Sequence, residues 1–439
     1  MLASRLYIHE LLKKNQNLKS VTWRSNKWII ESNTDKVSLF SPENGCTCIL
    51  SWSEMESAKA DPNSPVALII GRLMSSRIQL PLPQQRLVVM PVLGEGCGGN
   101  CRYCFIPPGN SRRGLLDIAD VIRFVESEYK AGEVHIDFSG NLSRYKDEII
   151  SISKHLKSLI GENVSFSVQT TGGDIDNETA HCLGQQGFSF GVSFDGTPTL
   201  HEFHRRQSSD HTIRLLRLLL DSGYPHLVRC TISRRSIQNI DSMLAYMENL
   251  GIRSIILNKL RPPAVASILE IPSESEWLGF YEDWFNYALA HKFPDLCDDT
   301  ALKWLHRLGS SPMGWSNLCS TRWCELNCRI SILNMTNEIL QCARYWTKFP
   351  SQESGHSCPI DCSACFCRYH CGGGCRIERL HPAEHTVMCA QKRWIVSRLL
   401  RAILILPASE LVQFGFEEVP QALFTMARDT QSKALPNRG

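Results

Sequence analysis

Gly96-Cys-Gly-Gly-Asn-Cys-Arg-Tyr-Cys-Phe105 is the stretch that decides the fold assignment. Its three cysteines are separated by three and by two residues, and they follow the apolar run Arg86–Val92, which predicts a β-strand. Thiolates bind zinc or iron–sulfur clusters, and a closed structural site needs about four of them. Three thiolates on one loop can hold three irons of a [4Fe–4S] cluster and leave the fourth iron open. A zinc knuckle completed by a distant ligand is the alternative.

The composition describes a chain that can bury a sizeable core. Of 439 residues, 43% are hydrophobic, which suits two or three domains. The net charge of +3 is not concentrated in any run, so we expect no nucleic-acid partner. No apolar run approaches the ~20 residues that cross a bilayer, and the first ten residues are too polar for a signal peptide. We therefore expect a cytoplasmic protein with no membrane partner.

Strand and helix patterns alternate from Arg86 onward, which predicts parallel βαβ units. The expected strands are Arg86–Val92, Glu133–Phe138, Val164–Gln169, Phe188–Phe194, His226–Ile232 and Arg253–Asn258. The expected helices are Leu115–Ala131, Tyr145–Ile160, Asp174–Gln186, His211–Ser222 and Ser236–Leu250. The fold class is therefore α/β, with a partial (β/α)6 barrel of the TIM type that stays open. In parallel barrels the chemistry lies at the C-terminal ends of the strands.

Short polar motifs follow three of these strands. They are Phe138-Ser-Gly-Asn-Leu142, Gln169-Thr-Thr-Gly172 and Val192-Ser-Phe-Asp-Gly-Thr-Pro198, the last followed by His201 and Arg205. Each motif alone is typical of an ordinary strand end. In this order after the three-cysteine loop they reinforce one another, because all of them would meet at one end of the barrel.

The three-cysteine loop and these motifs together resemble the radical SAM enzymes. The resemblance implies that Cys97, Cys101 and Cys104 bind a [4Fe–4S] cluster whose open iron chelates S-adenosylmethionine (SAM). An electron from the cluster then releases methionine and a 5′-deoxyadenosyl radical. The SAM contacts that the resemblance implies are Tyr103, Ser139, Gly140, Asn141, Gln169, Ser193 and Arg205. Asn141 stands where the family usually has glutamate, which is a departure from the pattern.

Cysteines are concentrated in the C-terminal part. Eleven of the nineteen fall between Cys319 and Cys389, and in a reducing compartment such clustering points to metal. Arg329–Leu333 and Glu338–Leu340 predict a hairpin that brings Cys324 and Cys328 to Cys342.

The run Cys362-x2-Cys365-x5-Cys371-x3-Cys375, followed by Cys389, resembles the SPASM domain, which holds two auxiliary [4Fe–4S] clusters. The resemblance implies Cys324, Cys328, Cys342 and Cys375 for one cluster, and Cys362, Cys365, Cys371 and Cys389 for the other. Cys319 competes for a ligand role, and two zinc sites are the alternative.

Five segments are expected from these patterns. Residues 86–265 form the barrel and residues 319–395 the SPASM domain. Residues 1–85 form a small α+β module, either a winged helix that binds a peptide leader or a structural cap. Residues 266–318 bridge the two larger domains with an aromatic-rich helix, and residues 396–439 form a C-terminal helix and tail.

The resemblance implies an oxidoreductase that abstracts hydrogen from a ribosomally made peptide and installs a carbon–carbon, ether or thioether crosslink. Its partners would be a precursor peptide or protein and a reductant of the flavodoxin or ferredoxin type. One alternative is a sulfatase maturase that forms formylglycine, and another is a non-catalytic electron carrier. Ala343, which follows Cys342, cannot act as the general base that sulfatase maturases carry there, so we rank that alternative second. The sequence indicates neither the acid/base residue nor the bond formed.

Overall fold

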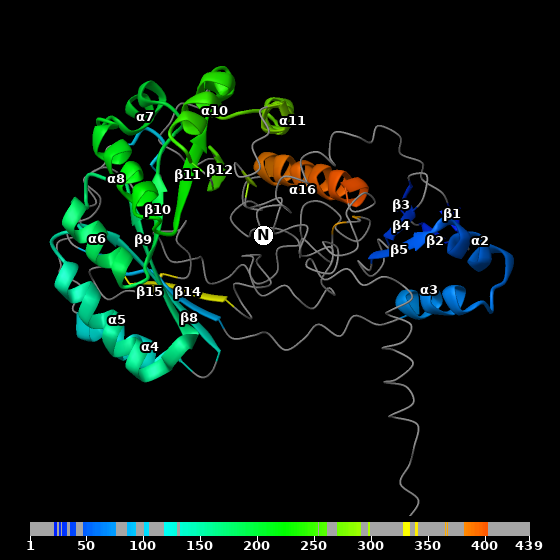
Figure 1. Ribbon diagram of the computed structural model, residues 1–439, viewed down its shortest axis with the longest axis horizontal. Coiled ribbons are helices and arrows are strands. Elements are labelled where there is room, and N and C mark those ends of the chain that lie inside the picture. The colour runs from blue at the N-terminus through cyan, green and yellow to red at the C-terminus, as the bar shows by residue number, and fades with distance from the viewer. Residues whose placement is uncertain are drawn as a thin grey trace, which may run out of the picture.

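The fold is taken from a computed structural model of the chain (Figure 1). The structure describes residues 22–23, 26–27, 29–32, 36–40, 47–75, 86–93, 101–104, 118–129, 132–252, 254–260, 270–290, 297–298, 328–333, 339–340, 365, 367 and 382–402. Within these residues no helix is both long enough and apolar enough to cross a bilayer.

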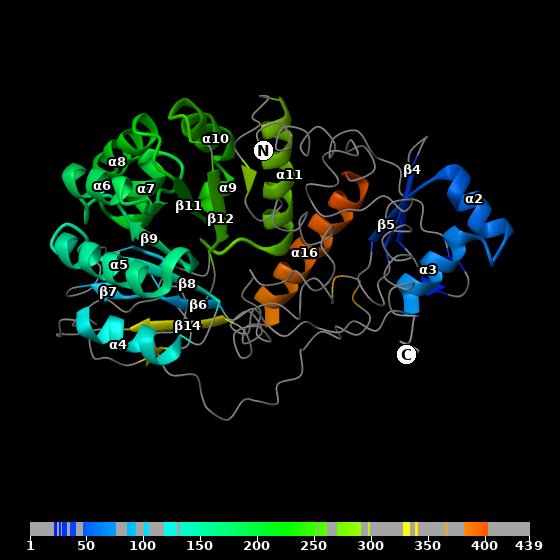
Figure 2. The same cartoon turned by 60° about the horizontal axis from the view of Figure 1, so that its bottom comes forward.

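Six parallel strands form a curled half-barrel, as the alternating pattern predicted (Figures 1 and 2). They are β6 (Arg86–Val89), β8 (Glu133–Gly140), β9 (Val164–Thr170), β10 (Ser189–Ser193), β11 (His226–Ile232) and β12 (Ser254–Lys259). Each strand pairs with the next one along the chain, from β6 to β12. The short strands β7 (Val92–Leu93) and β13 (Cys297–Asp298) pair with β8 and β12.

The predicted helices lie between these strands and cover the outer side of the curled sheet (Figure 1). They are α4 (Ile118–Glu128), α5 (Lys146–Ile160), α6 (Asn177–Gln185), α8 (Asp210–Asp221) and α10 (Ile240–Asn249). Two short helices were not predicted, α7 (Pro198–Arg205) and α9 (Arg234–Ile237). The start of α7 has a sequence cause, because the side chain of Thr197 accepts a hydrogen bond from the Leu200 amide and Pro198 occupies the first turn.

The two faces of the half-barrel differ in polarity. On β8, Val134, Ile136 and Phe138 are buried in the main hydrophobic core with the helices. The alternate residues His135 and Asp137 point to the opposite side, because side chains alternate along a strand. We call that opposite, concave side the inner face. Its polar side chains suit a polar ligand better than a packed core.

The N-terminal module contains a second sheet. It is antiparallel, with β3 (Ile29–Ser32), β4 (Lys36–Phe40) and β5 (Thr47–Ser51), and it precedes α2 (Trp52–Ala60) and α3 (Pro65–Ser75). A two-residue pair, β1 (Thr22–Trp23) and β2 (Asn26–Lys27), precedes it. Side chains of β4 alternate between the two faces of this sheet. Val37 and Leu39 therefore pack with the two helices, whereas Phe40, on the opposite face, belongs to the main core.

Two long helices link this module to the half-barrel. In α11 (Glu274–Ala290), the aromatic side chains of Trp277, Phe280, Tyr281 and Trp284 are buried. The Trp277 indole donates to Gln391 of α16 (Pro382–Ala402) over 3.0 Å. Near the C-terminal end of α16, the Ser38 hydroxyl of β4 donates to the Leu400 carbonyl over 3.2 Å. Helix α16 therefore lies between the two sheets, as Figure 2 shows.

The predicted cysteine hairpin is present, with β14 (Cys328–Leu333) antiparallel to β15 (Ile339–Leu340). A further pairing was not predicted: β14 also pairs in parallel with β6, with Cys328 opposite Arg86. The hairpin thus extends the half-barrel sheet past its first strand. Four residues of the segment expected to hold auxiliary clusters, from Cys328 to Ser331, therefore pair with the strand that precedes the three-cysteine loop.

Candidate functional site

The described part of the three-cysteine loop is a tight turn. The Cys104 amide donates to the Cys101 carbonyl over 3.1 Å, and both cysteines are partly exposed. Cys97, the first predicted ligand, lies outside the described residues. Two thiols held within one turn are a soft donor set with the spacing a cluster needs, so the residues present fit a [4Fe–4S] group.

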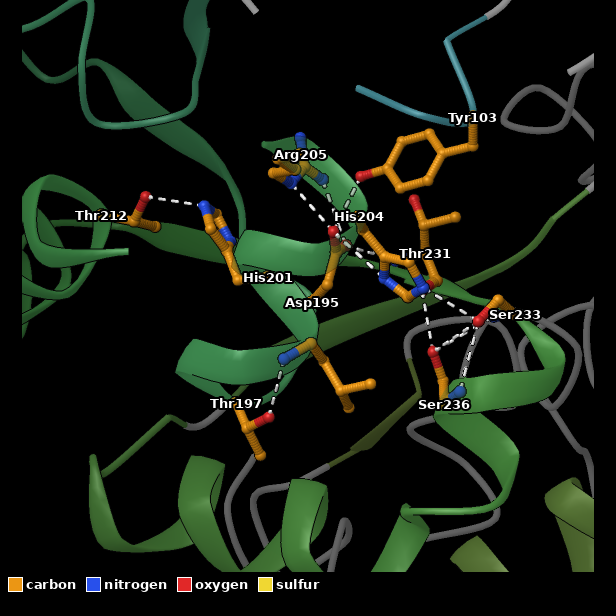
Figure 3. A network of polar contacts seen from close by, with 11 residues as sticks. Tyr103, Asp195, Thr197, His201, His204, Arg205, Thr212, Thr231, Ser233 and Ser236 are labelled. Atoms are coloured by element: carbon orange, nitrogen blue, oxygen red, sulfur yellow. Dashed lines mark hydrogen bonds and ion pairs between the residues drawn. The ribbon is translucent and has the colours of Figure 1, made fainter. Parts of the chain in front are cut away.

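Helix α7 holds this turn in place. The Arg102 amide donates to the His204 carbonyl over 2.7 Å, and the Arg102 guanidinium lies 4.3 Å from the centre of the Phe203 ring. The Tyr103 hydroxyl donates to the Asp195 carboxylate over 2.8 Å (Figure 3). Backbone, cation–π and side-chain contacts therefore fix the two residues between the ligand cysteines.

Asp195 is the centre of the polar network in Figure 3. Its side chain is 0% exposed and lies just after β10. The Arg205 guanidinium donates to both carboxylate oxygens, over 2.9 and 3.2 Å, and the Thr231 amide donates over 2.9 Å. One carboxylate thus connects the cysteine turn, α7 and the end of β11.

The charges in this network stabilise each other. Burial alone would raise the pKa of Asp195, but the Arg205 guanidinium and the neighbouring donors hold it well below its usual range. Burial alone would lower the pKa of Arg205, but the Asp195 carboxylate raises it above its usual range. Burial also raises the pKa of Tyr103, so the phenol keeps the proton that it donates. The pair is therefore ionised and the phenol neutral throughout the physiological range.

His204 extends the network to α9. Its Nε2 atom lies 2.9 Å from the Ser233 hydroxyl, and its Nδ1 atom lies 3.7 Å from the Asp195 carboxylate. Ser233 also accepts a hydrogen bond from the Ser236 amide and so caps α9. The cysteine turn, α7, the end of β11 and α9 are in this way connected to the buried carboxylate of Asp195.

Two predicted SAM contacts, Tyr103 and Arg205, belong to this network. Their SAM-binding role stays a prediction, and the structure adds a second role, which is to position the cysteine turn. The sequence reasoning missed Asp195, His204 and Thr231 as positioning residues. A signal was present, because Asp195 directly follows the expected strand Phe188–Phe194. A helix starting at Pro198 would also place His201 and Arg205, four residues apart, on one face.

The predicted contacts after β8 lie in a constrained turn. Gly140 has φ of 109°, and a Cβ atom there would lie 2.0 Å from the Leu93 carbonyl oxygen, so the position requires glycine. The Asn141 side-chain oxygen accepts from the Arg144 amide over 3.2 Å. Asn141 therefore shapes the turn that follows Ser139, and its predicted SAM contact stays a prediction.

Gln169 and Ser193 lie on the inner face. Gln169 donates to Asp137 over 3.0 Å, and Asp137 also accepts from Ser167. A Cβ atom at Gly191 would lie 2.2 Å from the Gln169 side chain, so glycine leaves room for this amide. The inner face is thus an ordered polar surface beside Ser193.

Few of the predicted auxiliary ligands are described. Cys328 begins β14, Cys389 lies on α16, and Cys365 packs against the main core. Cys324, Cys342, Cys362, Cys371 and Cys375 lie outside the described residues, as does Cys319. The described residues contain no group of three or more His, Cys, Asp or Glu side chains that could hold a metal, so both cluster assignments stay predictions.

Buried His201 of α7 makes stability depend on pH. Burial, and then the Arg205 charge, lower the pKa of His201 to about 4. An unfolded histidine titrates near ~6.5, so between these values the unfolded chain binds more protons. We expect the free energy of unfolding to fall by about 2 kcal/mol from this residue between pH 7.5 and pH 5.

Urea unfolding of the apoprotein at the two pH values measures this effect. His201→Gln should remove that part of the pH dependence, whereas His211→Gln, at an exposed position on α8, should keep it. Equal pH dependence in His201→Gln and the unchanged protein would contradict the assignment.

Comparisons with known proteins agree with this geometry. Residues 92–246 match the family described as the radical SAM superfamily. A serine-type anaerobic sulfatase-maturating enzyme of Klebsiella aerogenes is 26% identical over 129 residues, which cover 27% of this chain and 31% of the relative. The match thus spans about a third of that curated relative.

Two solved structures share the fold. Native anSMEcpe with bound AdoMet and Cp18Cys peptide aligns with a TM-score of 0.57 at 15% identity, over 73% of this chain and 100% of that chain. Native anSMEcpe with bound AdoMet aligns with a TM-score of 0.51 at 15% identity, over 60% of this chain and 75% of that chain. Residues 92–246 therefore form a radical SAM domain, the domain of an enzyme superfamily that uses a [4Fe–4S] cluster and SAM.

Proposed function

We propose that this protein is a radical SAM enzyme that abstracts a hydrogen atom from a peptide and installs a side-chain crosslink. The observation that carries the proposal is the fixed position of the cysteine turn. Cys101 and Cys104 lie in a turn that Tyr103, through Asp195, fixes at the C-terminal edge of a half-barrel. The edge where the strands end is where parallel barrels perform chemistry.

The cysteine turn and the inner face have different roles in this proposal. When bound, the cluster supplies the electron that splits SAM into methionine and a 5′-deoxyadenosyl radical. The hydrogen bonds of Tyr103 and Thr231 to Asp195 keep the cysteine turn close to the ends of β10 and β11. The polar inner face below it, with Gln169 and Ser193, offers hydrogen bonds to SAM and to a peptide.

A peptide substrate is supported by the relatives. The curated relative is named as a sulfatase-maturating enzyme, and anSMEcpe, which shares the fold, holds the Cp18Cys peptide. Our preference for a crosslink over formylglycine rests on Ala343 after Cys342, where a general base would be needed. The formylglycine reaction is the second candidate because of the curated relative.

The N-terminal sheet offers a place for the leader of such a peptide. Strand β5 is an edge strand of the β3-β4-β5 sheet, and an extended peptide can add to an edge by backbone hydrogen bonds. Residues 319–395 would hold two auxiliary clusters in a SPASM domain, with the hairpin β14–β15 extending the sheet next to β6. These clusters would accept the second electron when the crosslink closes.

The reaction assay separates the candidates. The reconstituted enzyme is incubated with SAM, dithionite and peptides from short reading frames next to its gene, with a sulfatase-derived Cys/Ser peptide in parallel. A crosslink lowers the peptide mass by two hydrogen atoms and leaves no group that reacts with a hydrazide probe. Hydrazide labelling of the sulfatase peptide would instead favour formylglycine formation. Absence of 5′-deoxyadenosine with every peptide and without peptide would overturn the enzyme proposal.

A further inference from the structure

Polar side chains line the inner face where β8 and β9 pair. Strands of parallel sheets are usually apolar on both faces, yet every second residue of this pair is polar. The register pairs on this side are His135 with Ser165, Asp137 with Ser167, and Ser139 with Gln169. The residues between them, such as Ile136 and Phe166, are buried in the main core. The polar residues therefore share one face of the sheet, the face on which SAM and substrate are proposed to bind.

Four of these residues form a continuous row of hydrogen bonds, which we call the inner-face row: Ser165, His135, Ser167 and Asp137. The Ser165 hydroxyl lies 2.8 Å from His135 Nδ1, and the Ser167 hydroxyl lies 3.0 Å from His135 Nε2. Ser167 donates its only hydroxyl proton to the Asp137 carboxylate, so its oxygen accepts from His135. In a neutral imidazole this places the proton on Nε2 and leaves Nδ1 to accept from Ser165.

The inner-face row runs from solvent to a buried carboxylate. Ser165 is exposed and His135 is partly exposed, whereas Ser167 and Asp137 are each 6% exposed. The hydrogen bonds that Asp137 accepts from Ser167 and Gln169 both reach its Oδ1 atom. Within the described part of the chain, the Oδ2 atom of Asp137 accepts no hydrogen bond. One carboxylate oxygen is thus joined to the row, and the other is left to accept a proton from a bound molecule.

The buried end of the row lies beside the predicted SAM contacts. Gln169 is one of them and donates to Asp137 over 3.0 Å, and Ser139 is the next inner-face residue of β8 after Asp137. Two strand residues span about 7 Å, so Asp137 lies one pleat below the C-terminal end of β8. Ser165 lies a further pleat toward the N-terminal ends of the strands. The row therefore leads away from the edge at which the cysteine turn is held.

Crosslink formation needs a proton acceptor, whichever bond is made. A hydrogen atom is removed from one side chain, and the carbon radical left behind bonds to an atom of a second side chain. That second atom loses its own hydrogen as a proton and an electron. In the proposed function the electron goes to an auxiliary iron–sulfur cluster, so a base must take the proton. Ala343 offers no base at the position after Cys342, so the acceptor lies elsewhere.

We propose that Asp137 accepts this proton and that Ser167 and His135 pass it to solvent at Ser165, an inference that rests on the proposed function. An imidazole can take a proton on one nitrogen while it releases one from the other, so the row can transfer a proton without large movements. Because Ser167 and Asp137 are buried, proton release does not require the reaction site to open to solvent.

The first measurement tests the direction of the row without turnover. NMR of the histidine side chains in the isotope-labelled, reconstituted protein locates the ring proton of His135, whose signals are assigned by their loss in His135→Gln. The row places this proton on Nε2. In Ser167→Ala the proton should exchange with solvent at least about tenfold faster, because its acceptor is gone. Ser189→Ala is the matched control: Ser189 is the register partner of Ser167 on β10, and its hydroxyl donates to the Phe166 carbonyl instead.

The second measurement follows the peptide assay in D2O with dithiothreitol and compares crosslinked peptide with 5′-deoxyadenosine. His135→Ala, Ser167→Ala and Asp137→Asn should keep peptide-dependent 5′-deoxyadenosine formation, which shows that they fold and bind. The ratio of crosslink to 5′-deoxyadenosine should fall at least about tenfold, and Ser189→Ala should keep it. A carbon radical that cannot close takes a deuterium atom from the thiol, so the peptide gains one carbon-bound deuterium.

Added imidazole distinguishes a proton transfer from a structural role. It should restore the crosslink in His135→Ala, where a ring is missing, and not in Asp137→Asn. Loss of the crosslink in all three variants without this rescue would assign the residues to packing and overturn the proposal.

Two further outcomes would also overturn it. The first is an unchanged ratio of crosslink to 5′-deoxyadenosine in the variants while the unchanged protein makes the crosslink. The second, which needs no peptide, is a His135 proton on Nδ1 or an exchange rate that Ser167→Ala leaves unaltered. If the unchanged protein forms no crosslink with any peptide, the proposed function fails, and the role of Asp137 fails with it.

Discussion

Simultaneous replacement of Cys97, Cys101 and Cys104 by alanine is expected to reduce SAM cleavage to background, a loss of at least about a thousandfold. The physical reason is that alanine cannot ligate iron, so the domain loses the group that supplies the electron. The turn of Cys101 and Cys104 is also held to α7 by the backbone and side chain of Arg102, contacts that do not involve the thiols. The measurement is 5′-deoxyadenosine formed by the anaerobically reconstituted variant.

Iron analysis accompanies this assay. With three clusters in the unchanged protein, about twelve irons are expected, and the triple variant should lose about four of them. Cys182→Ala, which changes a cysteine on α6 outside all the expected ligand sets, is the matched control and should keep both iron and activity. Continued 5′-deoxyadenosine production by the triple variant would refute the ligand assignment.

Asp195→Asn is expected to lower the free energy of unfolding by about 3–5 kcal/mol, because it leaves the Arg205 charge buried without a counterion. The amide also loses part of its capacity to accept hydrogen bonds from Tyr103 and Thr231. Urea unfolding of the apoprotein measures the change. Asp221→Asn, at an exposed position of α8, is the charge-matched control and should change stability by less than about 0.5 kcal/mol.

A double variant tests the cause. Asp195→Asn combined with Arg205→Met removes both charges, so it should be more stable than Asp195→Asn alone. Asp195→Asn alone should also reduce the iron held by the cysteine turn, because the amide is a weaker acceptor for the Tyr103 hydroxyl. Stability of Asp195→Asn equal to that of the unchanged protein would show that the pair contributes nothing to the fold.

Local patterns of the sequence predicted much of the fold. The expected strand Val164–Gln169 and helix Tyr145–Ile160 agree with β9 and α5 to within one residue. The hairpin after Cys328 is also confirmed. These elements were readable because their cause is local: apolar residues recur with period two in strands and near 3.6 in helices. The short helices α7 and α9 were missed, since their eight and four residues are too few to show a clear period.

The sequence predicted several residues of the candidate site, but only part of how they contact one another. Cys101, Cys104, Tyr103 and Arg205 were named from their motifs, and the structure brings them to one end of the half-barrel. The assignment of a parallel sheet with its chemistry at that end follows from βαβ alternation alone.

Two features were decided only by the tertiary structure: the pairing of β14 with β6 and the Asp195 network. Each depends on residues far apart in the chain, such as Tyr103 and Asp195, that meet only when the sheet curls. The sequence by itself determined which side chains can bind iron and where strands end, because those properties belong to single residues and short periods. Which charges are buried, and which of them find a partner, is a property of the packed fold, because burial and pairing exist only after distant segments exclude water together.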